Sequence, residues 1–132
     1  MAERETALLV RRTLRAGQQV RYSGTVVVLG DVNPGATVIA GADIVVVGQL
    51  RGFAHAGAGG DERATIVAFR LRPAQIRIAH HIARSPEAPE VVPDQPEMAA
   101  VVDGALVIRP YRPLLYGREL RGGSAEWGRS SS

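Results

Sequence analysis

The side chains that could carry acid–base or metal chemistry in this chain are few and poorly placed for it. Its histidines are His55, His80 and His81. Neighbouring residues of a strand point to opposite faces, so His80 and His81 cannot converge on one ion. No carboxylate stands at the spacing of a zinc motif, and there is no cysteine for a thiolate site. We therefore expect no metal centre and no cofactor, and we expect His55 to fill a corner of the fold.

The acidic residues and the glycine-rich loop also favour a structural role over catalysis. Asp31, Asp43, Asp61 and Glu62 could supply a carboxylate pair, but all four are expected at turns, where acids are common. The loop 57–61 resembles a phosphate-binding loop in composition, yet it matches no GxGxxG pattern. All 16 basic residues are arginine, so lysine-dependent phosphate binding and Schiff-base chemistry are excluded. We expect a protein that is not an enzyme.

Charge and composition exclude further classes of function. The net charge is +3, but the arginines are scattered among acids and aromatic residues are only 5%, so we expect no nucleic-acid partner. No apolar run reaches the roughly 18 residues of a membrane helix, and the first ten residues lack the apolar run of a signal peptide. These observations favour a cytoplasmic location.

An internal repeat organises the middle of the chain. The segment 17–32 aligns with 35–50 at a shift of 18, with glycine on glycine and valine on valine. A third copy, 65–71, aligns with 44–50 at a shift of 21, and a fourth partial copy starts at Arg72. Short β-branched runs bounded by glycine are too short for helices. A four-stranded sandwich would not explain the fixed shift. The repeat predicts a parallel β-helix of about three to four coils, each with about three strands of roughly six residues.

Alternation along these strands divides their residues into two sets, and both sets are almost wholly apolar. Only one set can face the interior, so the other must form an exposed apolar ladder, which usually marks a protein interface. We expect this ladder to join two copies in a homodimer. The alternative is that residues 1–13 or 98–113 fold back over it. The residues assigned to the dimer interface are Val27, Leu29, Val45, Val47, Ile66 and Ala68.

Three segments are expected along the chain. Residues 1–13 form a linker or an initial strand, and residues 14–113 form the β-helix domain. Within that domain, the proline-rich stretch 85–97 reads as an extended connection and 105–108 as a closing strand. Residues 114–132, rich in Gly, Ser and Arg, read as a tail that is disordered or derived from an expression vector.

Ordered blocks of the repeat closely resemble the C-terminal domain of the bacterial septum site-determining protein MinC. The resemblance runs from about residue 14 to residue 84, with weaker support near 105–110. It implies an all-β fold, a right-handed parallel β-helix that forms a homodimer. The blocks that carry it are Arg15–Gln18, Val27–Ala36, Val46–Gly52, Ala54–Asp61 and Pro73–Ala79.

The resemblance also implies partners. It implies binding to the ATP-bound, membrane-associated ATPase MinD, with the membrane reached only through MinD, and contact with the FtsZ C-terminal tail. In the family an Arg-Ser-Gly-Gln motif contributes to the MinD surface; here Arg15, Gly17 and Gln18 match it and Ala16 does not. By the repeat, Gly35 lies one coil from Gly17 on the same edge.

One more residue joins this expected surface. Arg51 follows Leu50 at a corner, where it is either an interface arginine or a solvated edge charge. The expected function is therefore that of a dimerisation and protein-binding domain of a cell-division inhibitor that acts on the FtsZ ring. The resemblance also implies that this chain lacks the N-terminal domain of the full-length inhibitor.

Other β-helix proteins remain as alternatives. A bactofilin-like protein would polymerise end to end through its open coils. A hexapeptide-repeat acyltransferase would show a strict six-residue period, and a polysaccharide-cleaving enzyme would show clustered acids or a catalytic histidine. Neither of these two patterns is evident in the sequence.

Overall fold

The chain folds into short strands that wind into a solenoid. The computed structural model describes residues 6–84 and 94–111, and these residues contain strands, turns and no helix. The expected tail, 114–132, lies outside the described residues, as does most of the expected connection 85–97. The strands are β1 (Ala7–Val10), β2 (Gln19–Tyr22), β3 (Thr25–Val28), β4 (Thr37–Ala40), β5 (Ile44–Leu50), β6 (Phe53–Ala56), β7 (Ile66–Leu71), β8 (Gln75–Ile78), β9 (His81–Arg84), β10 (Glu97–Val102) and β11 (Ala105–Pro110).

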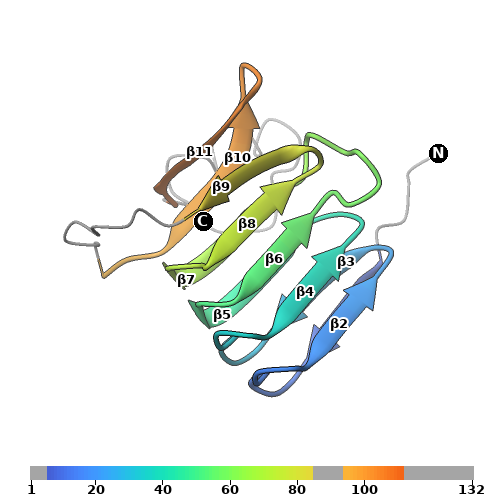
Figure 1. Ribbon diagram of the computed structural model, residues 1–132, viewed down its shortest axis with the longest axis vertical. Coiled ribbons are helices and arrows are strands. Elements are labelled where there is room, and N and C mark those ends of the chain that lie inside the picture. The colour runs from blue at the N-terminus through green and yellow to red at the C-terminus, as the bar shows by residue number, and fades with distance from the viewer. Residues whose placement is uncertain (1–5, 85–93, 112–132) are drawn as a thin grey trace, which may run out of the picture.

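Two sheets form opposite walls of the solenoid (Figure 1). Sheet A has the order β1-β3-β5-β7-β10-β11, and sheet B has the order β2-β4-β6-β8-β9. The chain alternates between the sheets, so each strand from β3 to β8 pairs in parallel with the strand two before it. This is a parallel β-helix of about four coils, which confirms the fold class predicted from the repeat.

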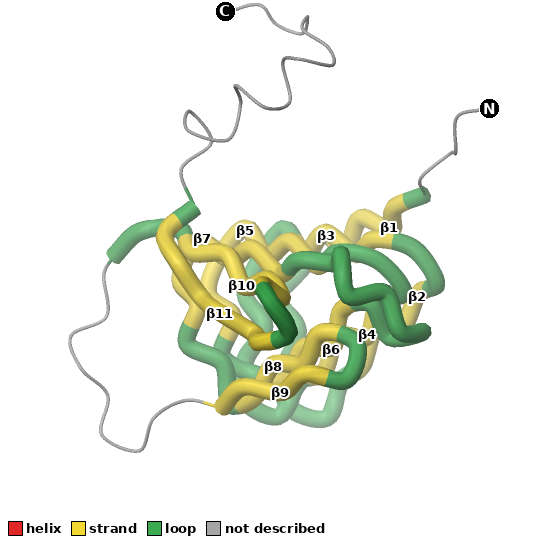
Figure 2. Tube along the Cα trace, turned by 90° about the horizontal axis from the view of Figure 1, so that it is seen from above, coloured by secondary structure: helices red, strands yellow, loops and turns green. Residues whose placement is uncertain are grey.

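The third side of each coil is much shorter than predicted. It contains no full strand; instead, isolated parallel bridges join Leu14 to Val32 and Val32 to Leu50. All three side chains are fully buried. The expected three strands of six residues are therefore wrong, because a single buried residue per coil closes the interior on this side. Figure 2 shows the strands of the two sheets facing each other, with loops joining them.

The register confirms the shift of 18 for the first coils but corrects the later one. Val26 pairs with Ile44 at a shift of 18, whereas Ile44 pairs with Ile66 at a shift of 22. After a bulge between Val46 and Gln49, Leu50 pairs with Leu71 at a shift of 21. The predicted shift of 21 thus holds only beyond the bulge, because the bulge gives β5 one more residue than β7 at that point.

The interior is packed with aliphatic side chains from both sheets. Along β3 to β8 the burial alternates residue by residue before the bulge, as one inward face per strand requires. Among the described residues no polar or charged residue is buried in this core. The largest fully buried side chains are Leu14, Ile44, Leu50, Ile66, Ile76, Ile78, Val26, Val28, Val32, Val38 and Val46.

The two ends of the solenoid differ. At the C-terminal end β9 turns back antiparallel on β8, and the hairpin β10–β11 joins sheet A antiparallel to β7. Val101 and Leu106 of that hairpin pack against the core. At the other end β1 and β2 are the outermost described strands. Residues 7–10, expected in a linker or initial strand, form β1 as part of sheet A.

Candidate protein-binding surfaces

A tight turn at residues 15–18 presents the first set of predicted partner-binding residues. The Gln18 N–H donates to the Arg15 carbonyl at 2.9 Å, and the Gln18 Oε1 accepts the Arg15 N–H at 2.8 Å. The guanidinium of Arg12 also reaches this Oε1, at 3.4 Å. Arg15, Ala16, Gly17 and Gln18 are all exposed. The glutamine side chain therefore fixes the turn from within and leaves the Arg15 side chain directed to solvent.

The next coil stacks directly on this turn, as the repeat predicted. The Gly17 N–H donates to the Gly35 carbonyl at 2.9 Å, which places both glycines on one edge. Both have positive φ, 86° and 90°, where side chains are strained. A Cβ added at Gly35 would lie 2.9 Å from the Ala16 Cβ. Close stacking of these two turns thus requires glycine at 35.

Arg51 lies on the same edge, two coils from Arg15. Each of the two arginines directly follows a residue of the buried third side, Leu14 or Leu50. The Arg51 N–H donates to the Val32 carbonyl at 2.8 Å, and the side chain of Arg51 is exposed. The structure therefore brings together all six residues assigned to partner binding, on one corner between the third side and sheet B.

The outward face of sheet A carries the predicted apolar ladder, with one correction. Val27, Leu29, Val45 and Val47 alternate with buried neighbours and face outward, as predicted. Ile66 and Ala68 are 0% exposed and face the core, so their assignment to the ladder is wrong. The single shift of 21 ignored the bulge at Gly48 and moved this strand by one residue, which exchanges its two faces.

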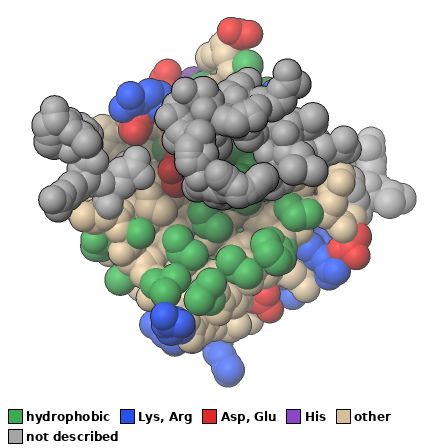
Figure 3. Space-filling model, turned by 180° about the vertical axis from the view of Figure 1, so that it is seen from behind, with side chains coloured by type: hydrophobic (Ala, Val, Ile, Leu, Met, Phe, Trp, Pro, Cys, Tyr) green, Lys and Arg blue, Asp and Glu red, His purple; other side chains and the backbone are tan. Residues whose placement is uncertain are grey.

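Three residues that the sequence prediction missed complete the ladder. Val67 pairs with Val45 and faces outward, Phe69 is 51% exposed, and Leu9 on β1 is 44% exposed beside Val27. Figure 3 shows apolar side chains spread over this face. The bulge could have been inferred from Gly48 itself, since an isolated glycine inside a strand often marks a bulge. Strands β1, β10 and β11 extend sheet A rather than fold over it.

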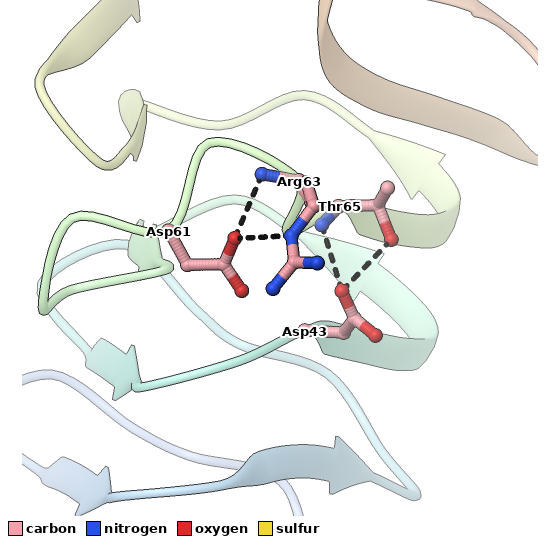
Figure 4. Close-up of polar contacts among 4 residues, drawn as sticks. All are labelled: Asp43, Asp61, Arg63 and Thr65. Atoms are coloured by element: carbon pink, nitrogen blue, oxygen red, sulfur yellow. Dashed lines mark hydrogen bonds and ion pairs between the residues drawn. The ribbon is translucent and has the colours of Figure 1, made fainter.

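The acidic residues of the turns hold backbone groups rather than reacting centres (Figure 4). The Asp43 Oδ1 accepts the Thr65 N–H at 2.8 Å, and the Asp61 Oδ1 accepts the Arg63 N–H at 2.9 Å. The hydrogen bonds from the Arg63 backbone and side chain lower the pKa of Asp61. Asp31 likewise accepts the Gln49 N–H at 2.8 Å. Carboxylates used in this way stabilise turns and are not placed as an acid–base pair.

The histidines do not converge. His55 lies within β6, not at a corner as expected, and its Nε2 contacts the Ala79 carbonyl at 3.1 Å. Burial lowers the pKa of His55. The Nε2 of His81 lies 3.1 Å from the Glu62 carboxylate. Among residues 6–84 and 94–111, no group of three or more possible ligands could hold a metal ion. These same residues contain no helix that is long and apolar enough to cross a membrane.

Comparison with known proteins gives one consistent family. The model for the septum formation inhibitor MinC, C-terminal domain, matches residues 8–111. The chain is 56% identical over 107 residues to the probable septum site-determining protein MinC of Heliobacterium modesticaldum, covering 81% of this chain and 37% of that protein. It is 46% identical over 111 residues to the protein of the same name from a Sulfurihydrogenibium species, covering 82% and 55%. The chain thus spans about half or less of these relatives.

A solved structure shares the fold. The structure described as the MinC:MinD cell division protein complex of Aquifex aeolicus matches with a TM-score of 0.77 and 37% sequence identity. The match covers 91% of this chain and 99% of that chain.

Proposed function

This chain belongs to the MinC C-terminal domain family, and from that premise we propose that it is a non-enzymatic dimerisation and protein-binding domain of a cell-division inhibitor. Its role is to bind the ATPase MinD and so to place inhibition of FtsZ ring assembly. The observation that carries the proposal is the corner where the turn 15–18 stacks on Gly35. The residues that match the family motif lie there and are exposed.

The chemistry of this corner suits a protein partner. The turn is held internally by Gln18, and the exposed glycines allow a partner's backbone to approach closely. The guanidinium groups of Arg15 and Arg51 have no ion pair within the described residues. Arginine is favoured at such sites because its planar fork makes paired hydrogen bonds to carboxylates. Ala16 lacks the hydroxyl of the family motif, so this position offers the partner only a methyl group.

Replacing Arg15 by alanine tests the assignment of the corner. We expect Arg15→Ala to weaken binding to ATP-bound MinD by about 2 kcal/mol, roughly thirtyfold in Kd, because a hydrogen-bonded charge on the partner loses its counterpart. A pull-down followed by a titration measures the loss. The matched control is Arg63→Ala, which removes an arginine from the loop before β7. Equal binding by the two variants would remove Arg15 from the site, provided that both keep the circular dichroism of the parent.

The outward face of sheet A is the proposed dimer interface. Exposed apolar side chains cover four neighbouring strands, from Leu9 on β1 to Phe69 on β7. Burying a few hundred Å² of such surface contributes several kcal/mol at roughly 25 cal/mol per Å². A twofold axis across this face closes the assembly and hides the same ladder on both copies.

Location and the second partner follow from the same proposal. The domain acts in the cytoplasm and reaches the inner face of the membrane through MinD. The FtsZ C-terminal tail is a further proposed contact. In a dimer formed through sheet A, the corner at Arg15 stays accessible to partners, because it lies between the third side and sheet B.

A further inference from the structure

The proposed docking corner continues beyond the matched motif as a column of stacked residues. Its members are the residues that directly follow the buried third side of each coil. The N–H of Asn33 donates to the Leu14 carbonyl at 2.9 Å, and that of Arg72 donates to the Leu50 carbonyl at 3.0 Å. Arg51 repeats this bond to Val32 at 2.8 Å. The column therefore consists of Arg15, Asn33, Arg51 and Arg72, at intervals of roughly 4.8 Å.

This column is strongly basic and makes no ion pair within the described residues. Arg15, Arg51 and Arg72 are exposed, and no described carboxylate lies within ion-pair distance of their guanidinium groups. The neighbouring acids have other contacts: Asp31 accepts the Gln49 N–H, and Asp94 pairs with Arg70.

One acid approaches the end of the column. Burial raises the pKa of Glu97, and the positive charge of the nearby Arg72 opposes this rise. This contact is not an ion pair within 4 Å. The Arg72 guanidinium therefore remains available to a partner at the end of the column.

Stacking like charges is unfavourable for the isolated domain. Arg51 and Arg72 occupy adjacent rungs directly after the ends of β5 and β7, and two exposed like charges at this spacing repel each other. Local arrangements that work against folding are typical of functional sites. An acidic partner would turn this repulsion into attraction, so the arrangement itself indicates the chemistry of what binds there.

We infer that Arg72 extends the docking corner and that the column Arg15, Arg51, Arg72 binds a row of carboxylates on the partner. This inference rests on the proposed function, since the partner is the ATPase proposed above. Carboxylates four residues apart on a helix are separated by about 5–6 Å, close to the single rung between Arg51 and Arg72. Carboxylates seven residues apart are separated by about 10 Å, close to the two rungs between Arg15 and Arg51. An acidic helix face laid along the column would give each arginine a carboxylate, bound through two parallel hydrogen bonds.

Charge reversal at Arg72 tests this inference. In surface biosensing with ATP-bound cognate MinD, we expect Arg72→Glu to raise Kd about tenfold and to lower the association rate. The dependence of log Kd on log salt should become shallower, because one attractive pair is removed. Arg63→Glu is the control, since Arg63 is 92% exposed but lies off the column.

The possible results distinguish the extended column from the proposed function. If the parent chain binds and Arg72→Glu binds with the parent's Kd and salt dependence, the extended column is overturned and the proposed function stands. If the parent chain fails to bind ATP-bound MinD, the proposed function is overturned and the inference with it. An equal loss in Arg63→Glu would also overturn the column, since it would show dependence on net charge alone.

Discussion

Asp43 and Asp61 have the same hydrogen-bonding role but differ in their surroundings. Asp43 lies between coils: its own N–H donates to the Thr25 Oγ1 at 3.3 Å, and its carboxylate accepts the Thr65 N–H. Asp61 accepts a hydrogen bond from the backbone of the exposed Arg63, two residues away in the same loop, and pairs with its guanidinium. The first carboxylate therefore connects three successive coils, whereas the second stabilises only a local turn.

This difference predicts unequal costs of substitution. Asp43→Ala should lower the free energy of unfolding by about 1–3 kcal/mol, because the half-buried Thr65 N–H is left without its acceptor. Asp61→Ala should cost about 1 kcal/mol or less, since its ion pair is exposed to solvent. Urea denaturation of both variants measures the two values. Equal losses would show that stacking by Asp43 does not stabilise the solenoid.

The single residue Gly48 explains the main error in predicting the candidate sites. The β-branched runs bounded by glycine were sufficient to predict β3 and β5, and the repeat was sufficient to stack them. The face of β7 was not predictable by one shift, because the bulge beside Gly48 changes the shift from 22 to 21 within a single strand pair. As a result, Ile66 and Ala68 were placed outside, and Val67 and Phe69 were missed.

At the level of elements, sheet A has two faces of nearly equal hydrophobicity but opposite roles. Val46 is fully buried, whereas its neighbour Val47 is 36% exposed on the outward ladder. Their sequence context alone did not tell which of them faces inward, since both are valine. The third side was also not predicted, because Leu14, Val32 and Leu50 recur every 18 residues but a single apolar residue per coil lacks the alternation that marks a strand.

The pair Val46 and Val47 tests the dimer face. We expect Val47→Asp to convert a dimer, stable at micromolar concentration, into a folded monomer, because a charge cannot be buried unpaired between two apolar faces. Val46→Asp should instead unfold the chain, since it places the same charge in the core. Sedimentation equilibrium with circular dichroism distinguishes these results, the monomer having a mass of 14.0 kDa. A monomeric parent chain, or a Val47→Asp variant that stays dimeric, would refute this interface.

At the level of the whole molecule, the closed C-terminal end argues against a bactofilin-like protein that polymerises end to end. The antiparallel strands β9 and β10 terminate the parallel stacking of both sheets, so a further coil cannot continue there in the same register. A filament built by head-to-tail stacking of coils is therefore disfavoured. Lateral pairing through sheet A needs neither end and leaves the basic corner exposed on each copy.

The central claim is that this domain is a protein-binding module whose partner is MinD, and a pull-down of cognate MinD by the parent chain tests it most directly. With ATP present, the account predicts that MinD is retained at about one copy per chain, since each copy of the domain carries one complete corner. Without nucleotide, retention should fall to the background of the empty resin. Failure of the folded chain to retain MinD in the presence of ATP would contradict the account.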